Sequence, residues 1–154
     1  IGIGAVALGI ARAAIDELVR LAQSKQRSNN TSTLADRAHS HLEVARAEAT
    51  LRSARAFYYQ TIEEAWLVAE AGERVSIEQR RDIRLATTYA VEASIKTVNA
   101  MYTLGGGSAV YADSPLQRHL RDVHMTSQHI MVAPSTLETV GRLYLGVEAQ
   151  TSTL

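Results

Sequence analysis

Residues 34–71 contain no glycine or proline, and this stretch restricts the fold of the chain more than any other feature. Because glycine and proline end most helices, a run of this length predicts one continuous helix of roughly 57 Å. Its apolar side chains recur with mostly helical spacing, at Leu42, Ala45, Ala49, Ala56, Tyr59, Ile62, Trp66 and Ala69. A helix of this length is long for a compact domain, so we expect it to belong to a bundle or to an assembly.

Two further long helices flank this run. The first is predicted over residues 3–25, where apolar side chains repeat every three or four positions. Residues 25–33 are polar and indicate a loop. The third helix is predicted over 77–104. It opens with a capping box of Ser76 and Gln79, and its inward stripe includes Ile83, Ala86, Ala90, Ala93, Thr97 and Met101.

The last third of the chain predicts two shorter helices. The fourth starts near Pro115 and ends before Pro134, and the fifth runs from a cap at Ser135 or Thr136 to about Gly146. No segment predicts a strand, and we expect a frayed tail after residue 150. The fold expected is all-α: an antiparallel four-helix bundle with a short extra C-terminal helix.

Composition limits the classes of function. The 154 residues suit one domain, and 16 basic residues balance 16 acidic ones, which disfavours nucleic acid as a partner. The absence of cysteine excludes disulfides and thiolate chemistry. Arg12 interrupts the apolar N-terminal run too early for a membrane span, so we expect a cytoplasmic domain without a membrane partner. Because the chain starts with Ile rather than Met, we expect a piece of a longer protein.

The histidines do not predict a metal site. His119, His124 and His129 are five residues apart, so on a helix their side chains diverge by about 140° from one to the next. Two metal-binding histidines on a helix are usually separated by three or four residues. No metal ligand is therefore assigned.

Two features could bind a ligand. Gly105, Gly106, Gly107 and Ser108 form a turn whose N–H groups could bind an anion, although a helix cap needs only one of these glycines. In the helix that follows, Arg118, Asp122 and His129 are predicted to share a polar face near Arg121 and Gln128, with Arg118 paired to Asp122. His129 could act as a base near neutral pH, or the whole face could simply be solvated.

Four segments together resemble the C-terminal helical domain of the acyl-CoA dehydrogenase superfamily. They are Gly-Gly-Gly-Ser-Ala-Val-Tyr, Ser-Pro-Leu-Gln-Arg-His-Leu-Arg-Asp-Val-His, the opening Ala-Leu-Gly-Ile-Ala-Arg-Ala-Ala-Ile-Asp, and Ala-Arg-Ala-Glu-Ala-Thr-Leu-Arg-Ser-Ala-Arg in the long second helix. The resemblance covers nearly the whole chain. It is strongest to the branch of two-component monooxygenases that use reduced flavin.

The resemblance implies a three-domain flavoenzyme in which residues 1–154 form the C-terminal bundle. An N-terminal helical domain and a middle β domain would precede it, so this chain alone would bind the flavin, FAD or FMN, incompletely. Gly105, Gly106, Gly107, Ser108 and Arg121 would contact the flavin. The bundles would pack into a dimer or tetramer, in agreement with apolar residues on more than one helix face.

The end of the chain indicates the branch. Dehydrogenases of the superfamily carry a Glu-Gly-Thr motif after this helix, which is absent here, and Glu138 stands in another context. His129 falls where the monooxygenases have a histidine near flavin and substrate. Arg27 lacks the Arg-x-x-Phe-Gly context of a flavin contact, so no such role is assigned to it.

The expected function is hydroxylation of a small organic substrate with oxygen and with reduced flavin from a separate flavin reductase. His129 is the predicted catalytic residue. The first alternative is an FAD-dependent acyl-CoA dehydrogenase. The second is a non-catalytic helical module for ligand binding or dimerisation, which would carry a helix-turn-helix that this sequence does not display.

Overall fold

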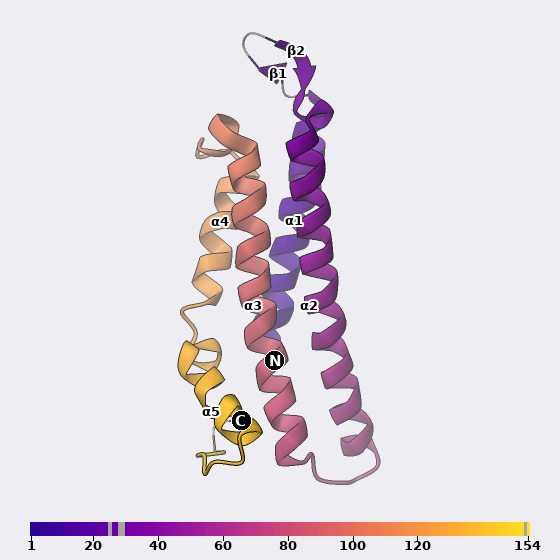
Figure 1. Ribbon diagram of the computed structural model, residues 1–154, viewed down its shortest axis with the longest axis vertical. Helices are drawn as coiled ribbons and strands as arrows, with labels where there is room; N and C mark the ends of the chain where they lie inside the picture. Colours follow the sequence, from indigo (N-terminus) through magenta and orange to yellow (C-terminus); the bar gives the residue numbers. More distant parts are fainter. Residues whose placement is uncertain (25, 28–29, 153) are drawn as a thin grey trace.

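The computed structural model describes residues 1–24, 26–27, 30–152 and 154. Its helices are α1 (Gly2–Ser24), α2 (Ala38–Glu70), α3 (Ile77–Gly105), α4 (Pro115–Thr126) and α5 (Pro134–Tyr144). The three long helices α1, α2 and α3 lie side by side along the long axis, and α4 and α5 follow one another beside α3 (Figure 1). This arrangement confirms the predicted all-α bundle with a short C-terminal helix.

Two short strands lie between α1 and α2, where the sequence predicted no strand. β1 (Gln26–Arg27) and β2 (Asn30–Thr33) pair in antiparallel orientation at one end of the bundle (Figure 1). Such short polar strands show no alternation that a sequence could reveal, since their pairing is imposed by the return of the chain from α1 to α2. The prediction of a loop over 25–33 is therefore wrong for the described residues, and Lys25, Ser28 and Asn29 lie outside them.

The second helix starts four residues later than predicted because a polar cap precedes it. The backbone N–H and the hydroxyl of Thr33 both donate to Asp36 Oδ2, at 2.7 and 2.8 Å. These bonds close a short 3₁₀ turn, η1 (Leu34–Asp36), whose Leu34 is buried in the core. The 33 residues of α2 then span roughly 50 Å.

Helix α3 is the centre of the bundle, because it packs against α1, α2, α4 and α5. Its predicted inward stripe is confirmed, with Ile83 half-buried and the other five residues buried. On the α1 side, Gly4 allows the closest approach: a Cβ atom there would lie 2.7 Å from Cε2 of Tyr58 and 3.3 Å from Cγ2 of Thr87. Small residues therefore let the long helices pack closely.

The fourth helix is shorter than predicted, and this changes the position of His129. Thr126 and Ser127 donate their hydroxyls to the carbonyls of Val123 and His124, at 2.6 and 2.7 Å, and such side-chain bonds compete with helix continuation. The chain leaves α4 and enters a second 3₁₀ turn, η3 (Ile130–Val132). The prediction that His129 shares a helical face with Arg118 and Asp122 is therefore wrong.

Helix α5 is capped differently from the expectation. Its N-cap is Ala133, and Pro134 occupies the first helical turn. The Thr136 hydroxyl donates to Ala133 O at 2.7 Å and lies 3.1 Å from the hydroxyl of Thr88 on α3. The helix is thereby tied to α3.

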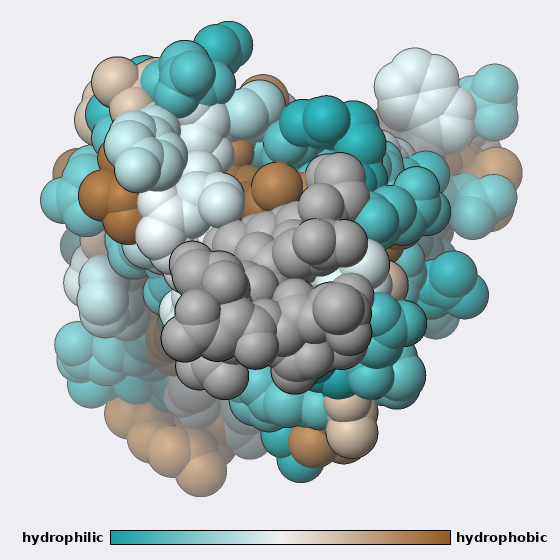
Figure 2. Space-filling view, turned by 90° about the horizontal axis from the view of Figure 1, so that it is seen from above, coloured by the Kyte–Doolittle hydropathy of each residue, from teal (hydrophilic) through white to brown (hydrophobic). Residues whose placement is uncertain are grey.

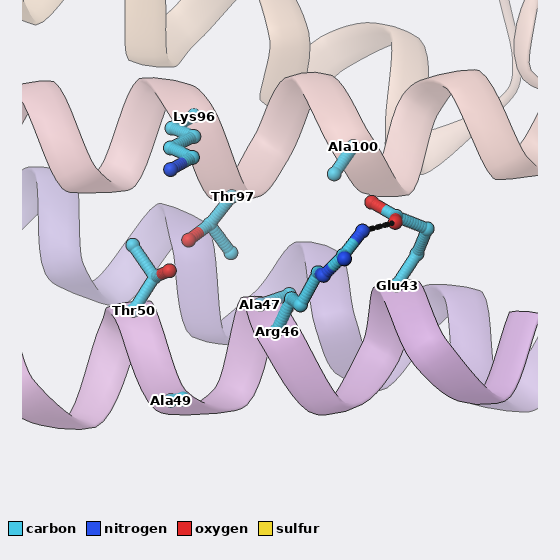
Figure 3. A pocket seen from close by; sticks show the side chains of 8 residues that line it. All are labelled: Glu43, Arg46, Ala47, Ala49, Thr50, Lys96, Thr97 and Ala100. Carbon is cyan, nitrogen blue, oxygen red and sulfur yellow. Dashed lines mark hydrogen bonds and ion pairs between the residues drawn. The ribbon is translucent and has the colours of Figure 1, made fainter.

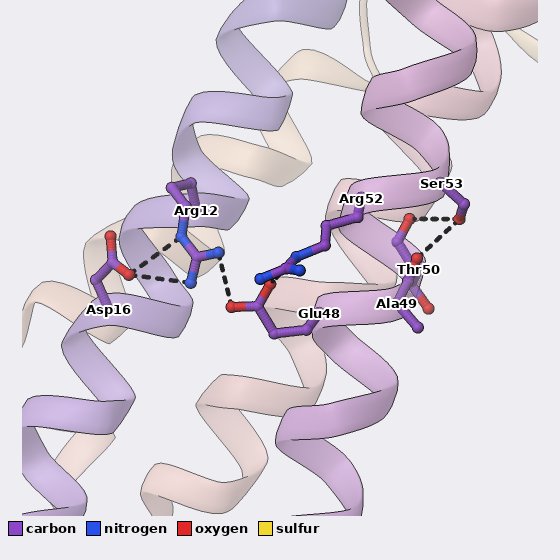
Figure 4. A network of polar contacts seen from close by, with 7 residues as sticks. All are labelled: Arg12, Asp16, Glu48, Ala49, Thr50, Arg52 and Ser53. Atoms are coloured by element: carbon purple, nitrogen blue, oxygen red, sulfur yellow. Dashed lines mark hydrogen bonds and ion pairs between the residues drawn. The ribbon is translucent and has the colours of Figure 1, made fainter.

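Charged side chains hold α1 to α2. Arg12 Nη1 donates to Glu48 Oε1 at 2.8 Å, and Arg12 also pairs with Asp16 on its own helix (Figure 4). Arg52 Nε donates to the second oxygen of Glu48 at 3.0 Å. Seen down the long axis from the β1–β2 end, most of the coloured surface is hydrophilic, with apolar side chains exposed in places at the rim (Figure 2). Within the described residues, no helix is long and apolar enough to cross a membrane.

Candidate functional site

The glycine turn divides into a packing part and an exposed part. Gly105 is buried, and a Cβ atom there would lie 2.8 Å from Cδ1 of Leu116 and 2.9 Å from Cβ of Ala109. Packing of α3 against the start of α4 accounts for this glycine without a ligand. Gly106 has φ +52°, a conformation that favours glycine, and its N–H caps α3 by donating to carbonyls of that helix.

Gly107 and Ser108 are the part of the turn that a ligand can reach. They lie in the 3₁₀ turn η2 (Gly106–Ala109). Gly107 is exposed, and a Cβ atom there would meet nothing within 4 Å, so the approach to its backbone is open. Ser108 is half-buried and carries a hydroxyl donor. This donor chemistry fits a phosphate group.

Arg121 lies further along α4 and is exposed. It is six residues after Pro115, which corresponds to about 9 Å along the helix axis. Its Nε is 3.4 Å from Asp122 Oδ1, so Asp122 pairs with its sequence neighbour and the predicted pair of Arg118 with Asp122 does not form within the described residues.

His129 is the N-cap of η3 and has a defined hydrogen bond. Its Nδ1 accepts from the backbone N–H of Met131 at 3.2 Å. Because a backbone N–H can only donate, Nδ1 carries no proton in this geometry, and the proton of the neutral ring is on Nε2. The side chain is exposed, and Nε2 has no hydrogen-bond partner within the described part of the chain. His129 therefore presents an N–H donor outward.

The other two histidines of this region are engaged differently. His119 is half-buried, and burial is the main reason that its pKa is lowered, so its ring stays neutral at pH 7. Nε2 of His124 is 3.1 Å from Oδ1 of Asn99 on α3. Across the described residues, no three His, Asp or Glu side chains come together as a metal site. Of the three, His129 is the one that is exposed and whose Nε2 has no hydrogen-bond partner within the described residues.

The predicted site residues do not converge on one point. The glycine turn is at one end of α4 and His129 lies beyond the other end, and the 12 residues of α4 span roughly 18 Å (Figure 1). Arg121 is between them. An elongated ligand could contact these groups in succession, whereas a compact one could reach only one end.

A cavity of about 490 Å³ lies elsewhere, between α2 and α3, and the sequence did not indicate it. Thr97, Thr50 and Lys96 project toward one another from the two helices, and Arg46 pairs with Glu43 beside them (Figure 3). The Thr97 hydroxyl is buried there and has no hydrogen-bond partner among the residues that the structure describes. The lining is mostly short side chains, and none of the predicted site residues belongs to it.

Comparison with known proteins places the chain in a family. The profile described as acyl-CoA dehydrogenase, C-terminal domain, matches residues 1–134. An indole-3-acetate monooxygenase from Pseudomonas putida is 38% identical over 92% of this chain, and one from Acinetobacter baumannii is 32% identical over 93%. The chain spans only 36% and 37% of the length of these two relatives.

A solved structure has the same fold. The 3-HSA hydroxylase from Rhodococcus sp. RHA1 superposes with a TM-score of 0.88 over 99% of this chain and 40% of its own, at 22% identity. At this level of identity the likeness concerns the fold alone.

Proposed function

This chain belongs to the family of acyl-CoA dehydrogenase C-terminal domains, and from that premise we propose that it is the C-terminal domain of a flavin-dependent monooxygenase. The observation that carries the proposal is the 38% identity to an indole-3-acetate monooxygenase over 92% of this chain. Residues 1–154 form a single helical domain of a three-domain enzyme, and the substrate is a small organic molecule. Indole-3-acetate is the first compound to test.

The residues of this chain contribute groups that bind the flavin and one hydrogen-bond donor. Reduced flavin, held by the complete enzyme, supplies the activation of molecular oxygen. The open backbone at Gly107, the Ser108 hydroxyl and the Arg121 guanidinium suit the phosphate end of such a cofactor. Gly105 and Gly106 shape the turn from within. The site is shared with other domains, so this chain by itself binds flavin incompletely.

His129 acts as a hydrogen-bond donor in this proposal. The sequence suggested a base, but a neutral ring whose Nδ1 accepts from Met131 N–H keeps its proton on Nε2 and cannot also accept one there. The Nε2–H group can instead donate to an oxygen atom that gains negative charge during the reaction. A donor aimed at developing charge commonly contributes 10²-fold to 10³-fold to the rate.

Substitution of His129 in the complete enzyme tests this role. We expect His129→Ala to slow hydroxylation of indole-3-acetate by about 10²-fold or more, measured with reduced flavin and oxygen in excess. Flavin affinity and assembly should change little, because the ring is exposed and its backbone position is held by η3.

Two matched variants complete this test. His119→Ala should lower stability more than rate, because its ring is half-buried, and His124→Ala should leave the rate near wild type, because its Nε2 already faces Asn99. If His124→Ala slowed the reaction while His129→Ala did not, the hydrogen-bond donor would be His124 and the assignment to His129 would be wrong. Rapid oxidation of an acyl-CoA thioester without oxygen would instead make the enzyme a dehydrogenase.

The proposed partners are a second copy of the chain and a flavin reductase. Helix α2 exposes several large apolar side chains, with exposed fractions of 48% for Leu42, 46% for Tyr59 and 66% for Trp66. Contacts between bundles in a dimer or tetramer would cover them. Sedimentation at micromolar concentration should give a dimer or tetramer, and a clean monomer would contradict this part of the proposal. Delivery of reduced flavin requires the reductase in the same compartment, which we propose to be the cytoplasm.

A further inference from the structure

A buried arginine holds the segment that carries His129. Arg84 on α3 is 8% exposed, and its Nη1 donates to the carbonyl oxygen of Met131 in η3 at 2.8 Å. Burial lowers the pKa of Arg84, but an arginine guanidinium remains charged at neutral pH. A hydrogen bond from a charged donor is about twice as strong as a neutral one, so this contact restrains Met131 firmly.

The same residue, Met131, is the hydrogen-bond partner of His129. Its N–H donates to His129 Nδ1, while its carbonyl accepts from Arg84. The two groups flank one Cα atom, so fixing the carbonyl limits rotation of the Met131 backbone and with it the direction of the N–H. Beside it, Val132 is 5% exposed and packs against Ala7 and Val91, which fixes the depth of the turn but not the aim of the N–H.

We propose that Arg84 is a positioning residue for His129. Through the Met131 backbone it keeps the N–H aimed at Nδ1, and this holds the imidazole in one orientation with its proton on the outward Nε2. The inference rests on the donor role proposed for His129 above. Packing alone does not require a buried charge at this position, since apolar side chains of similar volume commonly replace buried ions without loss of stability. The proposal gives the Arg84 charge a function.

The first measurement is the hydrogen bond itself. In protein labelled with ¹⁵N at His and Met, the scalar coupling between the Met131 amide nitrogen and His129 Nδ1 reports the N–H···N contact directly. We expect the coupling in the wild type and its loss in Arg84→Met, which keeps much of the volume and removes the guanidinium. Arg84→Lys, which retains a cationic donor, should restore part of it.

Thr88→Val is the matched control. Thr88 is also buried on α3, and its hydroxyl is 3.1 Å from that of Thr136 on α5, so its removal weakens a neighbouring attachment without touching Met131. The coupling should survive in Thr88→Val. If it survives in Arg84→Met as well, or disappears in both variants, Arg84 does not have the proposed specific role.

The second measurement is kinetic and uses the complete enzyme. Arg84→Met should lower kcat for hydroxylation by between about tenfold and 10²-fold with little change in KM. A misdirected donor reduces the stabilisation of the transition state more than it reduces the affinity for substrate. In the His129→Gln background the same substitution should have no further effect on kcat. Additive losses would overturn the proposal. If His129→Gln alone kept full activity, the donor role would fail, while the coupling would still decide whether Arg84 aims the Met131 N–H.

Discussion

Helices α2 and α3 are the longest in the chain and pack against each other, yet they bury their apolar residues in opposite ways. The apolar stripe predicted for α3 faces inward, and Ala86, Ala90 and Met101 are completely buried. The stripe noted on α2 faces outward: Tyr59 and Trp66 are exposed, and the buried side is formed mainly by Ala47, Leu51, Ala54, Tyr58, Thr61 and Ala65. Helical spacing of apolar residues therefore identified a face without saying what covers it.

The position of α1 explains part of this difference. Gly4, near the start of α1, lies against Tyr58, so the last third of α2, which follows Tyr58, extends beyond α1 and packs on α3 (Figure 1). The buried side chains of this last third, Thr61 and Ala65, are small. Helix α3 has neighbours along its whole length, whereas the last third of α2 packs, among the described residues, on α3 alone (Figure 1). The exposed apolar face of α2 is the surface that the proposed dimer or tetramer would cover.

The largest change in stability is expected from substituting a buried side chain of α3, in contrast to the substitution of an exposed side chain of α2. Met101→Ala on α3 should lower the free energy of unfolding by about 2–5 kcal/mol, because it leaves a cavity in the core. Trp66→Ala on α2 should change it by less than about 1 kcal/mol when the protein is dilute enough to be monomeric. Urea unfolding monitored by circular dichroism measures both.

The Trp66 variant also tests what covers α2. If Trp66→Ala becomes strongly destabilising as protein concentration rises, the outward face is buried in the assembly. A large loss of stability at every protein concentration would instead mean that Trp66 packs within its own chain. The proposed difference between α2 and α3 would then be wrong.

The next effect concerns the closest approach of α1 to α2. Gly4→Ala should destabilise the protein by about 1–3 kcal/mol, because the new Cβ would lie 2.7 Å from the Tyr58 ring. Gly9→Ala on the same helix is the control. Its Cβ would meet nothing within 4 Å, and the better helix propensity of alanine should stabilise the protein by about 0.5–1 kcal/mol. Equal shifts of the melting temperature for the two variants would show that α1 does not pack this tightly.

The smallest effect is the ionic contact that ties α2 to α1. Hydrogen bonding from Arg12 lowers the pKa of Glu48 below its ordinary value of 4.5, so the charged carboxylate stabilises the fold. This contribution is present above the ordinary pKa and is lost as the pH falls through the lowered, folded-state value. Glu48→Gln should cost up to about 1 kcal/mol at pH 7, and the difference from wild type should vanish in acid.

Glu43→Gln is the matched control for this contact. Glu43 pairs with Arg46 on its own helix, so its loss should matter less than that of Glu48. A pH-independent difference between Glu48→Gln and wild type would show that the carboxylate charge is not what holds the helices.

The sequence predicted which residues belong to the candidate site, but it did not predict how they are arranged. The glycine turn and His129 were both found from residue type and resemblance. Their separation along α4, the burial of Gly105 and the pairing of Asp122 with Arg121 were not, because each depends on where α4 begins and ends. Arg84 and the Met131 backbone gave no signal, since nothing in the sequence distinguishes Arg84 from the nearby Arg80 and Arg81, and a main-chain N–H is present at almost every residue.

The sequence by itself determined the helices and their order, because glycine, proline and capping residues mark where a helix can start and stop. It also determined the central stripe of α3, where apolar spacing and burial coincide. Only the tertiary structure decided which face of α2 is inside, that α4 ends at Thr126, and which nitrogen of His129 carries the proton. The buried face of α2 depends on contacts with helices far away in the chain, whereas the end of α4 and the His129–Met131 bond depend on a local backbone path that residue spacing does not reveal. A local pattern records what a segment prefers, and its neighbours in space decide which of those preferences is satisfied.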